Sequence, residues 1–133
     1  MADFLYSNIK AKMLSGGFSW TGNDIVAVLV SAQYAPSVNH ATLQDIPASA
    51  RVAISDNLTG KTVNVNVVDA DDVTISSVSG PEVNAIILAV DSGDEATSWL
   101  ICHLDSSVTG LPFEPAGDVL LSWSNDTGRI FAL

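Results

Sequence analysis

Few residues in this chain could carry chemistry, because the sequence contains one cysteine and two histidines. Cys102 and His103 are adjacent on an expected strand, where neighbouring side chains point to opposite faces, so a thiolate–imidazole pair has poor geometry there. The chain contains no His-x-x-x-His, Cys-x-x-Cys or Gly-x-Ser-x-Gly pattern, which zinc sites and serine nucleophiles often use. We therefore predict no enzyme, no catalytic residue, no cofactor and no metal site. We expect Cys102 to pack in the core as a small hydrophobic residue.

The most concentrated charge is Asp69-Ala70-Asp71-Asp72, and carboxylates at such spacing can bind calcium. Counted as an EF-hand loop from Asp69, the required glycine at position six is Thr74, and the required glutamate at position twelve is Gly80. A solvated acidic loop is therefore the favoured interpretation, with a cation site as the alternative. Residues 91–95 form a second acidic turn with the same interpretation.

Two further chemical patterns are weak. Gly60-Lys61-Thr62 resembles the end of a phosphate-binding loop, but Ser55 stands where that loop needs glycine, and an alternating strand pattern follows instead of a helix. A turn before a strand explains it better. Members of a catalytic triad can lie far apart in sequence, so a small hydrolase using His40 or His103 with an aspartate remains a third hypothesis. No sequence feature favours it.

The chain of 133 residues has 5 Lys+Arg against 15 Asp+Glu, a formal net charge of −10, yet 47% of its residues are hydrophobic. That balance excludes disorder throughout. It also excludes nucleic-acid binding by the free protein, because phosphate contacts need clustered basic residues. Arg51 and Arg129 are isolated, and we expect them to pair with the acidic loops and hold strand ends.

Length and hydropathy predict a single domain over residues 1–133. The longest apolar runs, Ile25–Val30 and Ala85–Val90, are far too short to span a bilayer, so we expect no membrane partner. The first residues lack the pattern of a signal peptide, and the single cysteine allows no intrachain disulfide, which favours synthesis in a cytosol.

A short helix is predicted over about residues 3–15, with Asp3 as its N-cap and Gly16-Gly17 as its end. Apolar residues recur there at helical spacing, and two lysines lie in its last turns, where cations favour the helix dipole. This helix could pack on its own domain or on a neighbouring subunit. The candidate interaction residues are Phe4, Leu5, Ile9, Lys10, Lys12 and Met13.

About eight strands are predicted after Gly17, between about residues 18 and 133, and residues 31–50 are expected to form a long loop. Ile25–Val30 is apolar throughout and is expected to be buried on both faces. Two hairpins are expected, one joining 52–54 to a strand over 63–67 and one joining 119–123 to 129–133. The predicted fold class is mainly β: an antiparallel β-sandwich or jelly-roll-like barrel with one short N-terminal helix.

Beyond these patterns, the order of segments resembles a family of small structural proteins of tailed bacteriophages. The resemblance begins with the short helix and covers nearly the whole chain, but its motifs are turn and strand signatures that carry no chemistry. The segments that carry it are 25–30, 43–47, 50–53, 60–63, 69–74, 109–112, 121–123 and 128–131.

The resemblance implies a virion component made in the host cytoplasm, most like a capsid decoration (cement) protein with a jelly-roll-like sandwich. Such a protein binds the outside of the phage head as a homotrimer and bridges neighbouring major capsid subunits. The alternative is a tail adaptor, fibre-associated or receptor (glycan)-binding module. Trp20 and Tyr34, if exposed near loops, would support that alternative, whereas Trp99 and Trp123 lie in apolar strands and are expected in the core.

Overall fold

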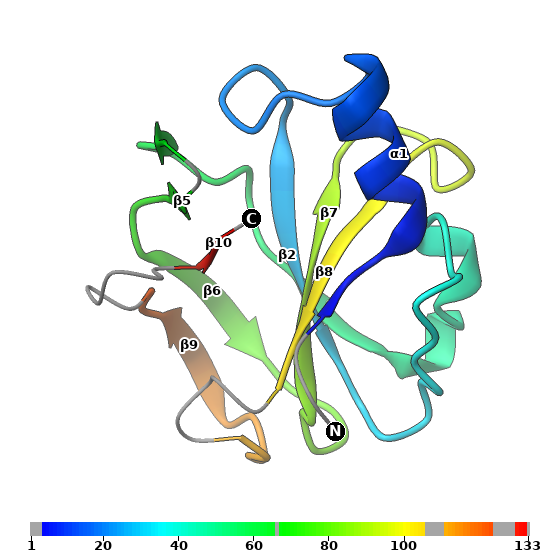
Figure 1. Cartoon of the computed structure of the whole chain (residues 1–133). Coiled ribbons are helices and arrows are strands. Elements are labelled where there is room, and N and C mark those ends of the chain that lie inside the picture. Colours follow the sequence, from blue (N-terminus) through cyan, green and yellow to red (C-terminus); the bar gives the residue numbers. More distant parts are fainter. Residues whose placement is uncertain (1–3, 66, 106–110, 124–129, 133) are drawn as a thin grey trace.

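The computed structural model describes residues 4–65, 67–105, 111–123 and 130–132 (Figure 1). It is mainly β, with 38% of residues in strands and 13% in helices, which confirms the predicted fold class at that level. Whether the strands form a sandwich or a barrel in the strict sense stays a prediction. The elements in chain order are β1 (Phe4–Leu5), α1 (Ser7–Ser15), β2 (Ile25–Val30), η1 (Leu43–Asp45), η2 (Ala48–Ala50), β3 (Arg51–Ile54), β4 (Thr62–Asn64), β5 (Val67–Asp69), β6 (Val73–Val78), β7 (Ala85–Val90), β8 (Leu100–Leu104), β9 (Gly117–Leu121) and β10 (Phe131–Ala132).

A five-stranded antiparallel sheet in the order β1-β8-β7-β2-β3 forms the centre of the molecule. Every residue of β2, β7 and β8 is buried. Antiparallel sheets commonly leave one face in water, and their strands then alternate apolar and polar residues. These three strands do not alternate because both of their faces are covered, as the continuous apolar run of β2 predicts.

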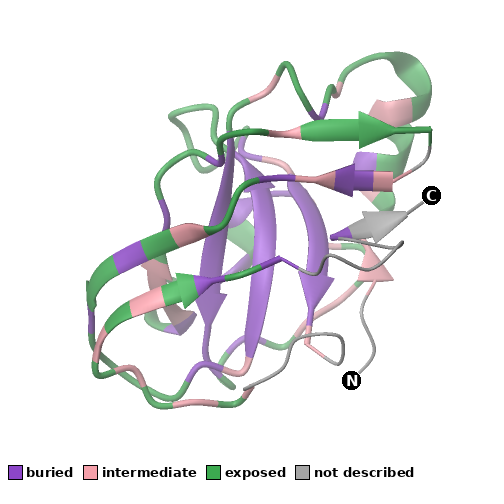
Figure 2. Cartoon of the chain, turned by 90° about the vertical axis from the view of Figure 1, so that its left-hand side faces the viewer, coloured by how far each residue is buried: buried purple, intermediate pink, exposed green. Residues whose placement is uncertain are grey.

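Different elements cover the two faces of this sheet. In Figure 1, α1 and the 31–50 segment with η1 and η2 lie to the right of the central strands, and β5, β6, β9 and β10 lie to the left. The left-hand strands form two small ribbons, one in the order β10-β5-β4 and one pairing β6 with β9. Figure 2 shows both ribbons in front of the buried central sheet. They are called the ribbon layer below.

The helix begins later than predicted. Phe4 and Leu5 form strand β1, which pairs antiparallel with His103 and Cys102 of β8, and α1 starts at Ser7 with Tyr6 as its N-cap. The Tyr6 N–H also bonds the Ile101 carbonyl, so pairing along β8 outweighs helical spacing for these residues. Asp3, the predicted N-cap, lies outside the described residues.

The predicted end of the helix is confirmed. Gly16 adopts φ 83°, a left-handed conformation that favours glycine, and its N–H bonds the Lys12 carbonyl. Lys12 lies in the last turn, as the sequence indicates.

Both predicted hairpins are wrong. β3 pairs with β2, and the expected strand over 63–67 breaks at Val65, where φ is 58°, so that β4 and β5 pair with each other. β9 pairs with β6 and β10 with β5, while the turn expected over 124–128 lies outside the described residues. The alternation of apolar and polar residues indicates which face of a sheet a side chain occupies, but it does not indicate which strands pair. Strands far apart in sequence can pair as readily as strands that are adjacent in sequence.

None of the helices in the described part of the chain is long and apolar enough to cross a membrane.

Candidate functional site

The cysteine and the histidines sit where the strand geometry predicts. Cys102 of β8 is buried and faces Leu88 of β7 across the sheet, which confirms its expected place in the core. His103 pairs with Ile87 instead, so the two side chains do lie on opposite faces. His40 belongs to the 31–50 segment.

His103 is buried on the sheet face that α1 and the 31–50 segment cover. Its ring stacks on Phe4, with centroids 5.0 Å apart and the planes at 6°, and it lies 6.3 Å from the Tyr34 ring. Its Nδ1 is 4.0 Å from Oδ2 of Asp105. Residues two apart along a strand share a face, so the spacing of this His–Asp pair was a signal that the sequence analysis missed.

Two tyrosines link this histidine's surroundings to His40. The hydroxyl oxygens of Tyr6 and Tyr34 are 2.8 Å apart, and the Tyr34 hydroxyl is 2.8 Å from Nδ1 of His40. Burial raises the pKa of Tyr6 far above its usual range, and burial also raises the pKa of Tyr34. Both phenols therefore stay protonated at neutral pH and serve as hydrogen-bonding groups, not as bases.

A cavity of about 310 Å³ opens beside these groups. It forms where β2 ends, β7 begins and β8 ends, because the antiparallel order brings these three strand ends to the same edge of the sheet. The lining residues are Val30, Ser31, Ala32, Tyr34, Pro36, Asn84, Ala85, His103 and Asp105. The fold thus brings together, in one pocket with several polar side chains, residues that range in the sequence from Val30 to Asp105.

The acidic segment at 69–72 is held by hydrogen bonds. The indole N–H groups of Trp20 and Trp123 donate to the carbonyls of Asp69 and Asp71. The Asp72 carboxylate accepts the backbone N–H of Trp123 at 3.1 Å. Within the described ranges, no three histidine, cysteine, aspartate or glutamate side chains gather as a metal ion would need. This segment joins β5 to β6 within the ribbon layer.

The aromatic side chains offer little exposed platform. Trp20 and Tyr34 are buried, so they do not give the receptor-binding alternative the exposed aromatic surface that would support it. Trp123 is buried as expected, whereas Trp99 is only half-buried and carries Lys12 above its ring, with Nζ 4.0 Å from the centroid.

The candidate interaction residues near the N-terminus are largely engaged within the chain. Ile9 is fully buried. Phe4, Leu5 and Met13 are partly buried against the same core, and Lys12 covers Trp99. Lys10 is exposed. These contacts therefore support packing of the helix on its own domain, and not on a neighbouring subunit.

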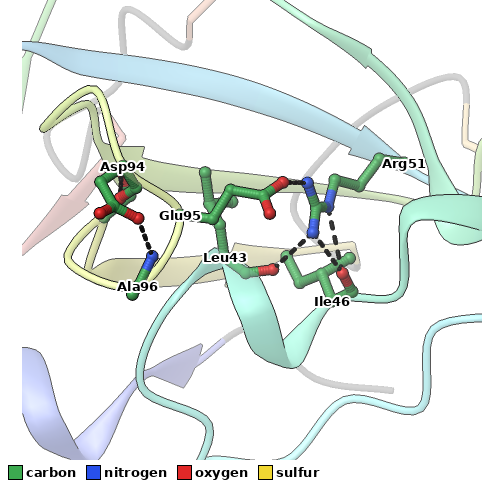
Figure 3. A network of polar contacts seen from close by, with 7 residues as sticks. Leu43, Ile46, Arg51, Asp94, Glu95 and Ala96 are labelled. Atoms are coloured by element: carbon green, nitrogen blue, oxygen red, sulfur yellow. Dashed lines mark hydrogen bonds and ion pairs between the residues drawn. The ribbon is translucent and has the colours of Figure 1, made fainter.

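Arg51 pairs with the second acidic loop, as the sequence predicts (Figure 3). Its guanidinium contacts the Glu95 carboxylate and donates to the carbonyls of Leu43 and Ile46, at 3.0 Å and 2.9 Å from Nη2. This one side chain ties the start of β3 to η1 and to the β7–β8 loop. Arg129, the other predicted partner, lies outside the described residues.

Three of the six large apolar side chains that are exposed in the described part of the chain lie on the ribbon layer; the other three are Leu14, Val38 and Ile54. Val63 of β4 is 52% exposed, Val65 after it is 93% exposed, and Leu120 of β9 is 63% exposed. These three residues, which belong to two different ribbons, are together called the ribbon patch below. Leu14 on α1 is 91% exposed, on the other side of the central sheet.

The geometry thus offers a polar pocket that can bind a small ligand and an apolar ribbon patch that can contact another protein. In the His103–Asp105 pair, the carboxylate can orient the imidazole ring. Neither the scan against protein-family models nor the search of curated proteins finds a match to this chain.

Proposed function

We propose that this protein is a structural component of a bacteriophage particle, a decoration protein that binds the capsid exterior. The observation that carries the proposal is the ribbon patch. Val63, Val65 and Leu120 expose apolar surface in the ribbon layer, outside the three buried strands β2, β7 and β8 of the central sheet. Apolar surface presented in this way favours contact with another protein. The resemblance to small tailed-phage structural proteins supplies the capsid as that partner.

Charge is compatible with docking through this patch. The chain carries a net charge of −10, yet β4 consists of Thr62, Val63 and Asn64 and has no charged residue. An uncharged exposed strand can approach another subunit without like-charge repulsion, whereas proteins commonly protect such edges with lysine or other charges.

The proposed partner is the major capsid protein, and the proposed assembly is a homotrimer that bridges neighbouring subunits. A protein that binds only the assembled shell stabilises that shell by mass action. Three linked copies strengthen weak individual contacts through avidity. Such a role needs contact area and no reaction centre.

The test is to add purified protein back to capsids that lack it and to count bound copies per capsid. We expect hundreds of copies for the unchanged protein and its density on the capsid exterior in a particle reconstruction. The double variant Val63→Asp/Leu120→Asp should lose binding, because it places charges on the ribbon patch.

Leu14→Asp is the matched control, since it makes the same kind of change at an exposed residue of α1. It should bind like the unchanged protein. Density at the tail, a count of about six to eighteen copies, or loss of binding by Leu14→Asp alone would overturn the proposal or its docking face. A tail location would favour the adaptor or receptor-binding alternative.

A further inference from the structure

A chain of hydrogen bonds runs from the surface of the 31–50 segment to the start of α1. His40 is half-buried, and its Nδ1 lies 2.8 Å from the Tyr34 hydroxyl oxygen. That oxygen lies 2.8 Å from the hydroxyl oxygen of Tyr6, whose side chain is fully buried. These contacts connect a titratable side chain near the surface to the core, and the proposed capsid role does not use them.

When His40 is neutral, each hydrogen of this chain has an acceptor. Both phenols are protonated, because burial raises the pKa of Tyr6 and of Tyr34. The Tyr6 hydroxyl donates to the Tyr34 oxygen, and the Tyr34 hydroxyl donates to Nδ1 of His40. The backbone N–H of Ser37 also interacts with the Tyr34 oxygen. Since a hydroxyl oxygen has two lone pairs, this oxygen accepts no further hydrogen.

A proton on His40 adds one hydrogen more than these contacts can hold. Histidine takes up a proton in mildly acidic water, and both nitrogens of the charged ring are then donors. Nδ1 turns from acceptor to donor, so it competes with Tyr6 for the Tyr34 oxygen. In the described part of the chain, Tyr34 is the one hydrogen-bond partner of the Tyr6 hydroxyl. A buried donor that loses its acceptor costs free energy, which is recovered when the group reaches water.

The charged group nearest to His40 favours the protonated ring. Asp45 of η1 interacts electrostatically with His40. Hydrogen bonds from the backbone N–H groups of Ala41 and Thr42 lower the pKa of Asp45, so its carboxylate is still ionised at pH 5. The protonated ring therefore has a counter-charge inside the folded chain.

The other elements around this chain contribute no further carboxylate to it in the described part of the molecule. On β8, the His103 ring lies 6.3 Å from the Tyr34 ring, and the Cys102 thiol is close to Tyr6. On α1, Lys10 is exposed and Lys12 lies over Trp99. His40 is thus the group of this chain that changes its charge between neutral and mildly acidic pH.

We propose that the proton on His40 controls how firmly the N-terminal segment, β1 and the start of α1, is held on the domain. Tyr6 is the N-cap of α1, and its backbone N–H donates to the Ile101 carbonyl, so it fixes both the end of β1 and the start of the helix. Neutral His40 leaves the Tyr6 hydroxyl bonded. Charged His40 displaces that bond, and the segment opens more readily. The proposal does not depend on the capsid function.

The test is hydrogen exchange of backbone amides in the purified full chain at pH 7.5 and pH 5, corrected for the intrinsic exchange rate at each pH. The amides of Tyr6 and Ser7 donate to carbonyls outside the N-terminal segment. Their protection should fall about tenfold or more at pH 5, as loss of a buried hydrogen bond predicts. The control amides are those of Ser55 and Leu58, which donate to carbonyls of β2, and their protection should change less than about twofold.

Two variants test whether His40 causes the change. The chain has two histidines, so His40→Gln leaves His103 alone. Glutamine can accept the bond from Tyr34 and does not titrate, so the fall in protection at pH 5 should disappear. Tyr34→Phe removes the connecting hydroxyl, and the amides of the N-terminal segment should then have low protection at both pH values.

A fall in protection that persists in His40→Gln would assign the pH dependence to His103 or to a carboxylate and would overturn the proposal. Equal protection of Tyr6 and Ser7 at the two pH values in the unchanged protein would overturn it too, as would an equal fall at Ser55 and Leu58. If Tyr34→Phe does not fold, Tyr6→Phe replaces it. That variant lacks the buried hydroxyl that responds to the charge, so its protection should not fall at pH 5.

Discussion

The central sheet and the ribbon layer are both antiparallel β-structure, but they relate to water in opposite ways. β2, β7 and β8 are buried along their whole length, whereas all of β4 is exposed and β9 mostly alternates between half-buried and exposed residues. Burial on both faces makes each central side chain part of the core, so it tolerates little change. The ribbon layer covers the core with one side and leaves its other side exposed to water.

The largest expected effect compares the same substitution in both regions. Leu88→Ala in β7 should lower the free energy of unfolding by about 2–5 kcal/mol, because Leu88 is fully buried and the change leaves a cavity. Leu120→Ala in β9 should change it by no more than about 0.5 kcal/mol, because Leu120 is mostly in water already. Urea unfolding of both variants measures the difference, and equal losses would refute the contrast.

Arg51 is expected to hold the 31–50 segment, which covers the face of the central sheet opposite the ribbon layer. Arg51→Met should cost about 2–3 kcal/mol, because it removes the charged donors from the carbonyls of Leu43 and Ile46. Glu95→Gln is the control and should cost less than about 1 kcal/mol, since Glu95 is half-exposed and its ion pair is screened. Thermal unfolding compares them, and a larger loss for Glu95→Gln would show that the ion pair dominates.

Substitutions in the pair Tyr6 and Tyr34, on the same side of the sheet, should have a smaller effect on stability. Tyr34→Phe should lower the free energy of unfolding by about 1–2 kcal/mol, because the Tyr6 hydroxyl and His40 Nδ1 both lose a partner. Tyr6→Phe should cost less, since the Tyr34 hydroxyl keeps His40. The ranking of the two variants in chemical denaturation is the measurement. The reverse ranking would mean that the buried hydroxyl of Tyr6 has other partners of greater weight.

The smallest effect depends on pH. The backbone N–H of Ala41 lies 2.7 Å from the Asp45 carboxylate, and this bond, with that of Thr42, lowers the pKa of Asp45 below its usual range. The folded carboxylate thus keeps its charge to lower pH than the unfolded one does. Its contribution to stability is complete above the ordinary aspartate pKa of about 4 and is lost as the pH falls through the lowered folded value.

Asp45→Asn should therefore cost about 0.5 kcal/mol at pH 7, a small figure because the residue is exposed and screened. The difference from the unchanged protein should shrink at an acidic pH below the ordinary aspartate range, as the folded carboxylate takes up its proton. Unfolding curves at both pH values measure it, and a difference that grows on acidification would contradict the stated direction of the pKa change.

The pairing of strands shows where sequence reasoning ends. The apolar run of β2 correctly indicates burial on both faces, and Gly16 correctly ends α1. Neither hairpin expectation survives, because β3 and β9 find partners distant in sequence. The residues near the N-terminus are a second example. Their apolar periodicity predicted a helix through Phe4 and Leu5, but it carries no information about the edge of β8, with which these two residues pair.

The polar pocket could not be predicted at all. Its members come from the ends of three strands and from the first residues of the 31–50 segment, and their meeting depends on the order of strands in the sheet. Only the spacing of His103 and Asp105 was visible, because side chains two apart on a strand share a face.

Only local features of the fold could be predicted from the amino-acid sequence. A surplus of apolar residues in short runs, punctuated by acidic turns, specifies buried strands and one short helix, because burial and turn chemistry act over a few residues. Tertiary structure alone decided which strands are neighbours, which apolar residues stay in water, and which polar groups share a cavity. Those outcomes depend on competition among distant segments for the same sheet edges and the same core, and no local pattern contains that competition.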